Sequence, residues 1–345
     1  MLYKYLIPVL LLSALILGCA GRNPEESAKY LKSGIELQNI GKLDEAMNDY
    51  NKAIELDKKN QTAWYHRGIL FVSKNDLSKG IENLSEAIDI APDSARFYDA
   101  RGYVYITMLE YGKAMEDYEK AVEKDPKSAV YINRRGYVYA LLKDYIQAVK
   151  DYSKAIELNP RYEDAYANRG FAYLSLNKYD NVVSDFTKAI EFNPNRAIYY
   201  NTRGYAYANL KRYFDALPDY DKAVQTDSTL ADAYINRGYI FLNTDQFKFA
   251  LEDFDKAIKL GAANPMTFNA RGFAFANLRQ YPQAITDYSK AIELDPNLTD
   301  AYVNRGFSYF NSMDKPNALK DWQTAVTQKP ALDSTLKSYM EKAAK

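Results

Sequence analysis

Cysteine and histidine are almost absent from this sequence of 345 residues, which contains one of each, Cys19 and His66. A disulfide needs two cysteines, so none can form within the chain, and a zinc site of cysteine and histidine ligands is nearly excluded. No spacing suggests a cysteine or serine nucleophile for His66 as a base. Carboxylates are plentiful, but they follow the repeat described below, as a surface pattern does. We therefore expect no enzymatic activity, no cofactor and no metal site.

An excess of charge of either sign is also missing, because 45 lysines and arginines balance 45 aspartates and glutamates. Proteins that bind nucleic acids usually carry a basic excess or a basic stripe, so this class is disfavoured. The chain is 47% hydrophobic, which is typical of a folded protein. At this length it must form several domains or an extended array.

The N-terminus carries the conspicuous apolar run of the sequence, Leu6–Leu17, which follows a short segment containing Lys4 and ends at Gly18 and Cys19. The run is too short to span a bilayer comfortably, and an apolar stretch before a small residue is typical of a secretory signal. Residues 16–19 read Ile-Leu-Gly-Cys, which resembles the lipobox of bacterial lipoproteins.

This resemblance implies a signal peptide over residues 1–18 and lipidation of Cys19, which would become the first residue of the mature protein. Residues 19–26 would form a tether, and Ala20 after the cysteine implies sorting to the outer membrane of a bacterial envelope. An ordinary signal peptide or an anchor helix, with Cys19 incidental, is the alternative.

Glycine is infrequent, yet nine of the 15 glycines recur at a constant interval of 34 residues, at Gly34, Gly68, Gly102, Gly136, Gly170, Gly204, Gly238, Gly272 and Gly306. Such a fixed period predicts a repeat architecture. Placing each glycine at position 8 defines nine repeats, numbered 1 to 9, over residues 27–332. Position 27 is then alanine in all nine, and positions 11 and 24 are each aromatic in eight.

This arrangement of small and aromatic residues resembles the tetratricopeptide repeat family, over roughly nine-tenths of the chain. The resemblance implies an all-α fold: a right-handed superhelical solenoid of nine helix-turn-helix units with a C-terminal capping helix over residues 333–345. The hydrophobic periodicity agrees, since Tyr166, Gly170 and Tyr173 form one helical stripe and Phe186 and Ala189 lie on another. In the cap, the expected inner stripe is Leu332, Leu336, Tyr339 and Met340.

Prolines refine the predicted helices. Pro282 and Pro316 stand at position 18, which suits the first turn of the second helix of a repeat. Pro218 lies four positions further on and should bend its helix. At the junction of repeats 7 and 8, Asn264 is expected to cap a helix that begins at Pro265.

Arginine occupies position 7 in eight repeats, where the family usually has leucine, and aspartate occupies position 23 in eight. Repeats 3 to 9 carry both, for example Arg169 with Asp185. We interpret these residues as ion pairs between the two helices of a repeat, and solvated charges are the alternative.

In the family, the concave groove is lined by the first helix of each repeat. Residues 6, 9 and 13 of a repeat share one face of this helix, which predicts a ladder of aromatic rings flanked by amides in the C-terminal half. The expected groove residues are Tyr103, Tyr137, Asn168, Phe171, Tyr205, Asn209, Asn236, Tyr239, Asn243, Phe273, Asn277, Asn304, Phe307 and Asn311. The alternative is that the rings pack between repeats and the asparagines only solvate the groove.

These features predict a membrane-anchored interaction scaffold of the bacterial cell envelope, which binds partner proteins or extended peptides in its groove. A carbohydrate- or peptidoglycan-binding protein that stacks its rings on sugars is the second hypothesis. No nucleic-acid partner is expected.

Overall fold

The computed structural model describes residues 22–344, in two compact parts, residues 22–159 and residues 160–344. The predicted signal peptide and Cys19 lie outside the described residues. Within the described range the chain is helical and contains no strand. Over the same range, no helix combines the length and the apolar character that crossing a membrane requires.

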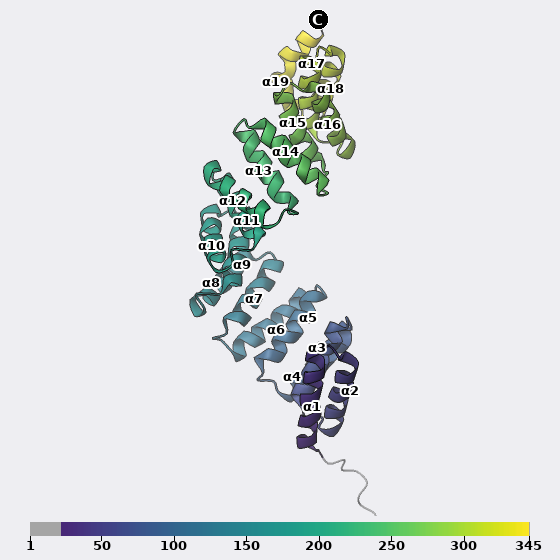
Figure 1. Ribbon diagram of the computed structural model, residues 1–345, viewed down its shortest axis with the longest axis vertical. Helices are drawn as coiled ribbons and strands as arrows, with labels where there is room; N and C mark the ends of the chain where they lie inside the picture. Colours follow the sequence, from purple (N-terminus) through teal and green to yellow (C-terminus); the bar gives the residue numbers. More distant parts are fainter. Residues whose placement is uncertain (1–21, 345) are drawn as a thin grey trace, which may run out of the picture. The chain divides into compact units, whose positions relative to one another are not determined.

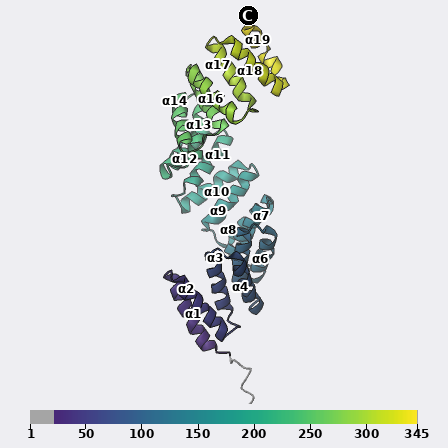
Figure 2. The same cartoon turned by 90° about the vertical axis from the view of Figure 1, so that its right-hand side faces the viewer.

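Each repeat contributes two consecutive helices that pack against each other, as Figures 1 and 2 show. The first helices are α1 (Pro24–Asn39), α3 (Gln61–Ser73), α5 (Ala95–Thr107), α7 (Ala129–Leu141), α9 (Glu163–Ser175), α11 (Ala197–Asn209), α13 (Ala231–Asn243), α15 (Pro265–Asn277) and α17 (Thr299–Asn311). The second helices are α2 (Leu43–Leu56), α4 (Leu77–Ile90), α6 (Tyr111–Lys124), α8 (Tyr145–Leu158), α10 (Tyr179–Phe192), α12 (Tyr213–Thr226), α14 (Phe247–Lys259), α16 (Tyr281–Leu294) and α18 (Lys315–Gln328). The predicted all-α fold of nine helix pairs is confirmed.

The first helix begins earlier than the sequence suggested. Pro24–Glu26, assigned to the tether, form the first turn of α1, because Asn23 accepts a hydrogen bond from the backbone N–H of Glu26 and Pro24 suits the first helical position. Three of the eight expected tether residues are therefore helical.

The proline predictions are confirmed in three places. Pro282 and Pro316 stand in the first turns of α16 and α18, and Asn264 caps α15 by accepting from the N–H of Thr267 at 3.0 Å. Helix α12 continues unbroken past Pro218. The bend at that proline stays a prediction.

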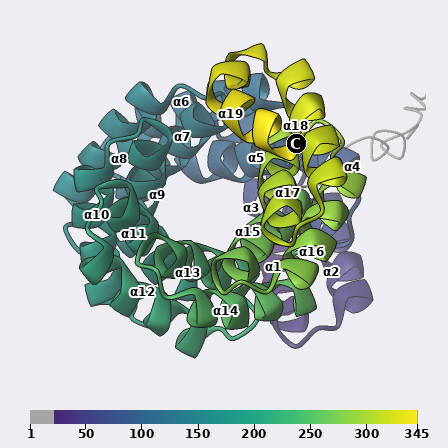
Figure 3. The same ribbon diagram turned by 90° about the horizontal axis from the view of Figure 1, so that it is seen from above.

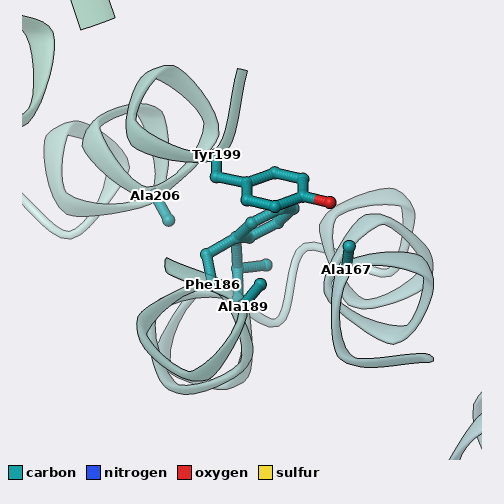
Figure 4. Close-up of a cluster of buried hydrophobic side chains, with 6 residues drawn as sticks. Ala167, Phe186, Ala189, Tyr199 and Ala206 are labelled. Carbon is teal, nitrogen blue, oxygen red and sulfur yellow. The ribbon is translucent and has the colours of Figure 1, made fainter. Parts of the chain in front are cut away.

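The core of each repeat is built where its two helices cross. A Cβ atom added to Gly170 would lie 2.7 Å from the ring of Phe186, and one added to Gly238 would lie 2.9 Å from the ring of Phe254. Glycine at position 8 therefore leaves room for the buried aromatic ring at position 24. In Figure 4 the ring of Tyr199, from the next first helix, lies over Phe186.

The C-terminal cap closes this core as predicted. A short 3-10 turn, Pro330–Leu332, leads into α19 (Asp333–Ala343). Leu336 of α19 is fully buried, and Leu332 and Met340 are partly buried beside it. The cap therefore covers the apolar end of repeat 9.

The turn between the two helices of every repeat places position 15 in the left-handed region. Gly41 has a φ of 79°, and the eight later repeats use residues other than glycine there, with φ between 55° and 67° at Asn75, Leu109, Lys143, Asn177, Lys211, Asp245, Arg279 and Met313. An L-residue in this region is strained by roughly 1–2 kcal/mol. The strain is thus distributed over the array.

Gly41→Ala is expected to lower the free energy of unfolding by about 1 kcal/mol, because only the backbone conformation opposes the added methyl group. No atom lies within 4 Å of the Cβ position at Gly41, and the same holds for Gly112 in α6. Gly112→Ala is the matched control and should raise stability by about 0.5 kcal/mol, since glycine is unfavourable in a helix. Chemical denaturation of both variants measures the difference, and equal shifts would refute this account of the turn.

Candidate functional site

The orientation of the first helices is fixed by arginines that reach the second helix of the same repeat. In each of repeats 3 to 9, the arginine at position 7 donates two hydrogen bonds of 2.6–2.9 Å to the two carboxylate oxygens of the aspartate at position 23. The predicted ion pairs are therefore confirmed and are bidentate. Their aspartates are buried.

Several of these arginines also donate to the second helix of the preceding repeat, which the sequence did not predict, namely Arg101, Arg203, Arg237, Arg271 and Arg305. Arg237 also donates through Nη1 to Asp221 at 2.7 Å, on the second helix of the preceding repeat, so one side chain joins three helices. Its guanidinium lies between the rings of Tyr234 and Phe241, with centroids at 5.7 and 5.8 Å. The hydrogen bond with Asp253 holds the pKa of the Arg237 guanidinium above its usual value, so the arginine stays charged.

The predicted ring ladder runs along the first helices, which Figure 3 shows on the inner side of residues 160–344, with the second helices outside. The side chains of Tyr205 and Phe273 are 41% and 40% exposed. Phe171 is also exposed, although it contacts the ring of Phe186 edge-on. In the N-terminal part, Tyr103 and Tyr137 are exposed at the same position.

Two members of the ladder differ from the others. Tyr239 is partly buried edge-on against Phe254, with ring centroids 5.5 Å apart, and burial raises the pKa of its hydroxyl. Phe307 contacts Trp322 and also Tyr339 of the cap, at 5.1 and 5.0 Å. The cap therefore covers the last ring, and the exposed ladder of this part ends at Phe273.

The asparagines at position 13 are anchored to their own helices. The Nδ2 groups of Asn209, Asn243 and Asn277 donate to the backbone carbonyls four residues earlier, at 2.8–2.9 Å. This bond fixes each side chain and uses one of its two amide hydrogens. The Oδ1 acceptor and the second hydrogen of each amide form no bond among the described residues. Asn311, at the same position of repeat 9, is exposed.

The asparagines at position 6 connect neighbouring first helices. Asn236 donates to Asn201 at 3.0 Å, and Asn304 donates to Asn269 at 3.2 Å. Asn168 stands at the same position of α9. These amides bind α11 to α13 and α15 to α17 directly, so they are structural as well as part of the surface.

Two successive hollows follow the ladder, the first chiefly between α11 and α13 and the second chiefly between α13 and α15. The first has a volume of about 280 Å³, the second has about 470 Å³, and they share Tyr239 and Asn243. The first is lined by Tyr205, Ala208, Asn209, Tyr213, Tyr220, Asn236, Tyr239, Ile240 and Asn243. The second is lined by Tyr239, Leu242, Asn243, Asp245, Phe247, Met266, Asn269, Ala270, Phe273, Asn277 and Asn304. Eight of the expected groove residues thus line these two hollows, namely Tyr205, Asn209, Asn236, Tyr239, Asn243, Phe273, Asn277 and Asn304.

The only histidine of the sequence is partly buried among aromatic rings and is uncharged at neutral pH. His66 contacts the rings of Tyr50 and Tyr65, and burial, followed by the charge of Arg96, lowers its pKa to about 4. Over the residues that the structure describes, no three histidine, cysteine, aspartate or glutamate side chains come together as metal ligands.

Comparisons with known proteins agree with this architecture. Family models described as TPR repeat match residues 39–74, 136–177 and 280–312, and models described as tetratricopeptide repeat match residues 61–94, 95–128, 163–196 and 231–264. Tetratricopeptide repeat protein 14 of Mus musculus is 43% identical over 53 residues, which are 15% of this chain and 7% of that protein.

Solved structures share the fold at low sequence identity. A tetratricopeptide repeat protein from Parabacteroides merdae is 20% identical with a TM-score of 0.53, over 73% of this chain and 99% of that one. The Cut9-Hcn1 hetero-tetramer of the APC/C contains a chain that is 15% identical with a TM-score of 0.54, over 94% of this chain and 77% of its own length. The family models together match more than half of the residues, at the period that the buried glycines and rings define. The chain therefore belongs to the tetratricopeptide repeat family.

Proposed function

We propose that this protein is a membrane-anchored scaffold of the bacterial cell envelope, which binds an extended segment of a partner protein across α11, α13 and α15. Tetratricopeptide repeat proteins mediate protein–protein interactions. The observation that carries the proposal is the pair of successive hollows, which both include positions 9, 12, 13 and 17 of one repeat and positions 6, 9 and 13 of the next and share Tyr239 and Asn243.

The chemistry of these hollows suits a peptide. Their rings can cover apolar side chains, and the unused groups of the position 13 amides can pair with a peptide backbone, which carries one donor and one acceptor per residue. The tetratricopeptide fold is typically a non-enzymatic scaffold. We therefore assign no catalytic step to the chain.

A crosslinking pulldown from native membranes tests the class of partner. The recovered complexes are divided and treated with protease or with lysozyme, which cleaves the glycan chains of peptidoglycan. A partner released as a discrete protein band and destroyed by protease is expected. Material that depends on intact glycan instead would favour the carbohydrate-binding alternative and refute the peptide assignment.

Cys19→Ser is expected to move the protein from the membrane fraction into a soluble or unprocessed pool, because the thiol that would carry the lipid is lost. The proposal rests on the lipobox-like end of the apolar run. Ala20→Asp is the matched variant, since it preserves Cys19 and should change only the membrane to which the protein is sorted. Unchanged fractionation and mobility of Cys19→Ser would refute the lipid anchor.

A further inference from the structure

We infer that the segment bound across α11, α13 and α15 is a polyproline II helix with an apolar residue at every third position and a basic residue opposite Asp232. This inference rests on the proposed function of the two hollows and specifies their occupant. Three features of the described residues lead to it: the spacing of the hollows, the alternation of charge at position 2 of the first helices and the unpaired amide groups.

The spacing of the hollows selects the conformation of the ligand. Helices α11 and α13 approach within 8 Å between Cα atoms, as do α13 and α15. Helices in such contact have axes about 8–10 Å apart, so equivalent sites recur at about that distance. A polyproline II helix presents the same face every three residues, or about 9.3 Å. A β-strand presents the same face about every 6.6 Å and misses this spacing.

The charge at position 2 of the first helices alternates with a period of two repeats. Position 2 of the first helix is aspartate in repeats 5, 7 and 9, at Asp164, Asp232 and Asp300, and each carboxylate is exposed. The intervening repeats carry Ile198 and Met266 there, and both are exposed apolar side chains. A segment that crosses α11, α13 and α15 therefore meets one such carboxylate, Asp232, with an apolar side chain at the equivalent position on each side.

No positive charge opposes these carboxylates at the groove positions. Positions 2, 5, 6, 9, 12 and 13 of repeats 5 to 9 contain three aspartates and no lysine or arginine. The arginines of these first helices stand at position 7 and are engaged with buried aspartates. The surface therefore favours a basic ligand and repels an acidic one.

The asparagines at position 13 can supply hydrogen-bond partners for the backbone of a polyproline II helix. This conformation forms no internal hydrogen bonds, so its carbonyl groups need outside donors. Asn209, Asn243 and Asn277 each retain one amide hydrogen and one acceptor after bonding to their own helix, and they recur once per repeat. One amide is thus available for every three ligand residues. Proline, which has no backbone N–H, is tolerated at the ligand positions that face no amide.

Fluorescence anisotropy with the full chain tests the inference. The probe is a labelled peptide that repeats leucine–proline–arginine–leucine–proline–valine. One control peptide has glutamate for arginine, a second has a glycine inserted after each triplet, and a third alternates leucine and arginine to favour a strand. We expect each control to bind at least tenfold more weakly. Asp232→Asn should weaken binding of the arginine peptide about threefold at low salt, without changing the melting temperature.

Equal binding of the glutamate peptide or of the alternating peptide would overturn the inference. Displacement of the probe by chitotetraose would overturn it too, because the hollows would then bind a sugar. If the membrane partner binds in the groove but the proline peptide neither binds nor displaces it, the polyproline II ligand is refuted. The proposed scaffold function would then still hold. If the partner binds elsewhere, the proposed function itself is wrong.

Discussion

Asp253→Ala is expected to lower the free energy of unfolding by about 3–5 kcal/mol, because it leaves the guanidinium of Arg237 without its buried counterion. Asp253 is 3% exposed and accepts two hydrogen bonds from Arg237, at 2.8 and 2.6 Å. Stability in a repeat array is the sum of local terms. The loss should therefore appear in denaturation and as faster hydrogen exchange in α13 and α14.

Asp221→Ala is the matched control, because Asp221 contacts the same guanidinium at 2.7 Å while its side chain is 53% exposed. An exposed pair of this kind contributes about 0–1 kcal/mol, so this variant should be nearly neutral. Arg237→Ala should cost more in the wild type than in the Asp253→Ala background, with a coupling of roughly 0.5–3 kcal/mol. If Asp253→Ala and Asp221→Ala lower the free energy of unfolding equally, and no coupling is found, Arg237 and Asp253 behave as solvated charges.

Replacing both Arg237 and Asp253 separates the effect of an unpaired buried charge from the effect of lost packing volume. Arg237→Met combined with Asp253→Leu removes the ion pair while keeping apolar volume, and such exchanges are often neutral or stabilising. The double variant should therefore recover most of the stability lost in Asp253→Ala. A double variant less stable than Asp253→Ala would indicate that the rings of Tyr234 and Phe241 require the guanidinium between them.

The sequence alone predicted those contacts that depend on the type of one residue at a fixed repeat position. Glycine at position 8 and an aromatic residue at position 24 predicted the helix crossing, because only a missing Cβ admits the ring. The pairing of Arg169 with Asp185 was also predictable from fixed spacing on two helices.

Other features depended on groups that the sequence does not place. The left-handed turn at position 15 was missed because only Gly41 signals it, and Leu109 or Met313 gives no such indication. The bond from Asn236 to Asn201 was missed because it needs the distance between two first helices. Phe307 matched the ladder pattern, but Tyr339 of the cap covers it.

The partial burial of the ladder yields a prediction that separates binding from packing. Phe273→Ala is expected to leave the melting temperature nearly unchanged and to weaken recovery of the membrane partner about thirtyfold, since the ring is 40% exposed beside the second hollow. Truncating an aromatic residue at the centre of an interface commonly costs about 2 kcal/mol of binding free energy, which corresponds to that factor.

Tyr239→Ala should behave differently, because the Tyr239 ring packs edge-on against the buried ring of Phe254. Its removal is expected to lower stability by about 3 kcal/mol, near the range for buried aromatic residues, as well as to weaken binding. Melting curves and pulldowns on the folded fraction measure both effects for each variant. If Phe273→Ala lowers the melting temperature while its folded fraction still recovers the partner, position 9 serves packing. The binding surface would then lie outside the two hollows, since Phe273 is the exposed ring that lines the second of them.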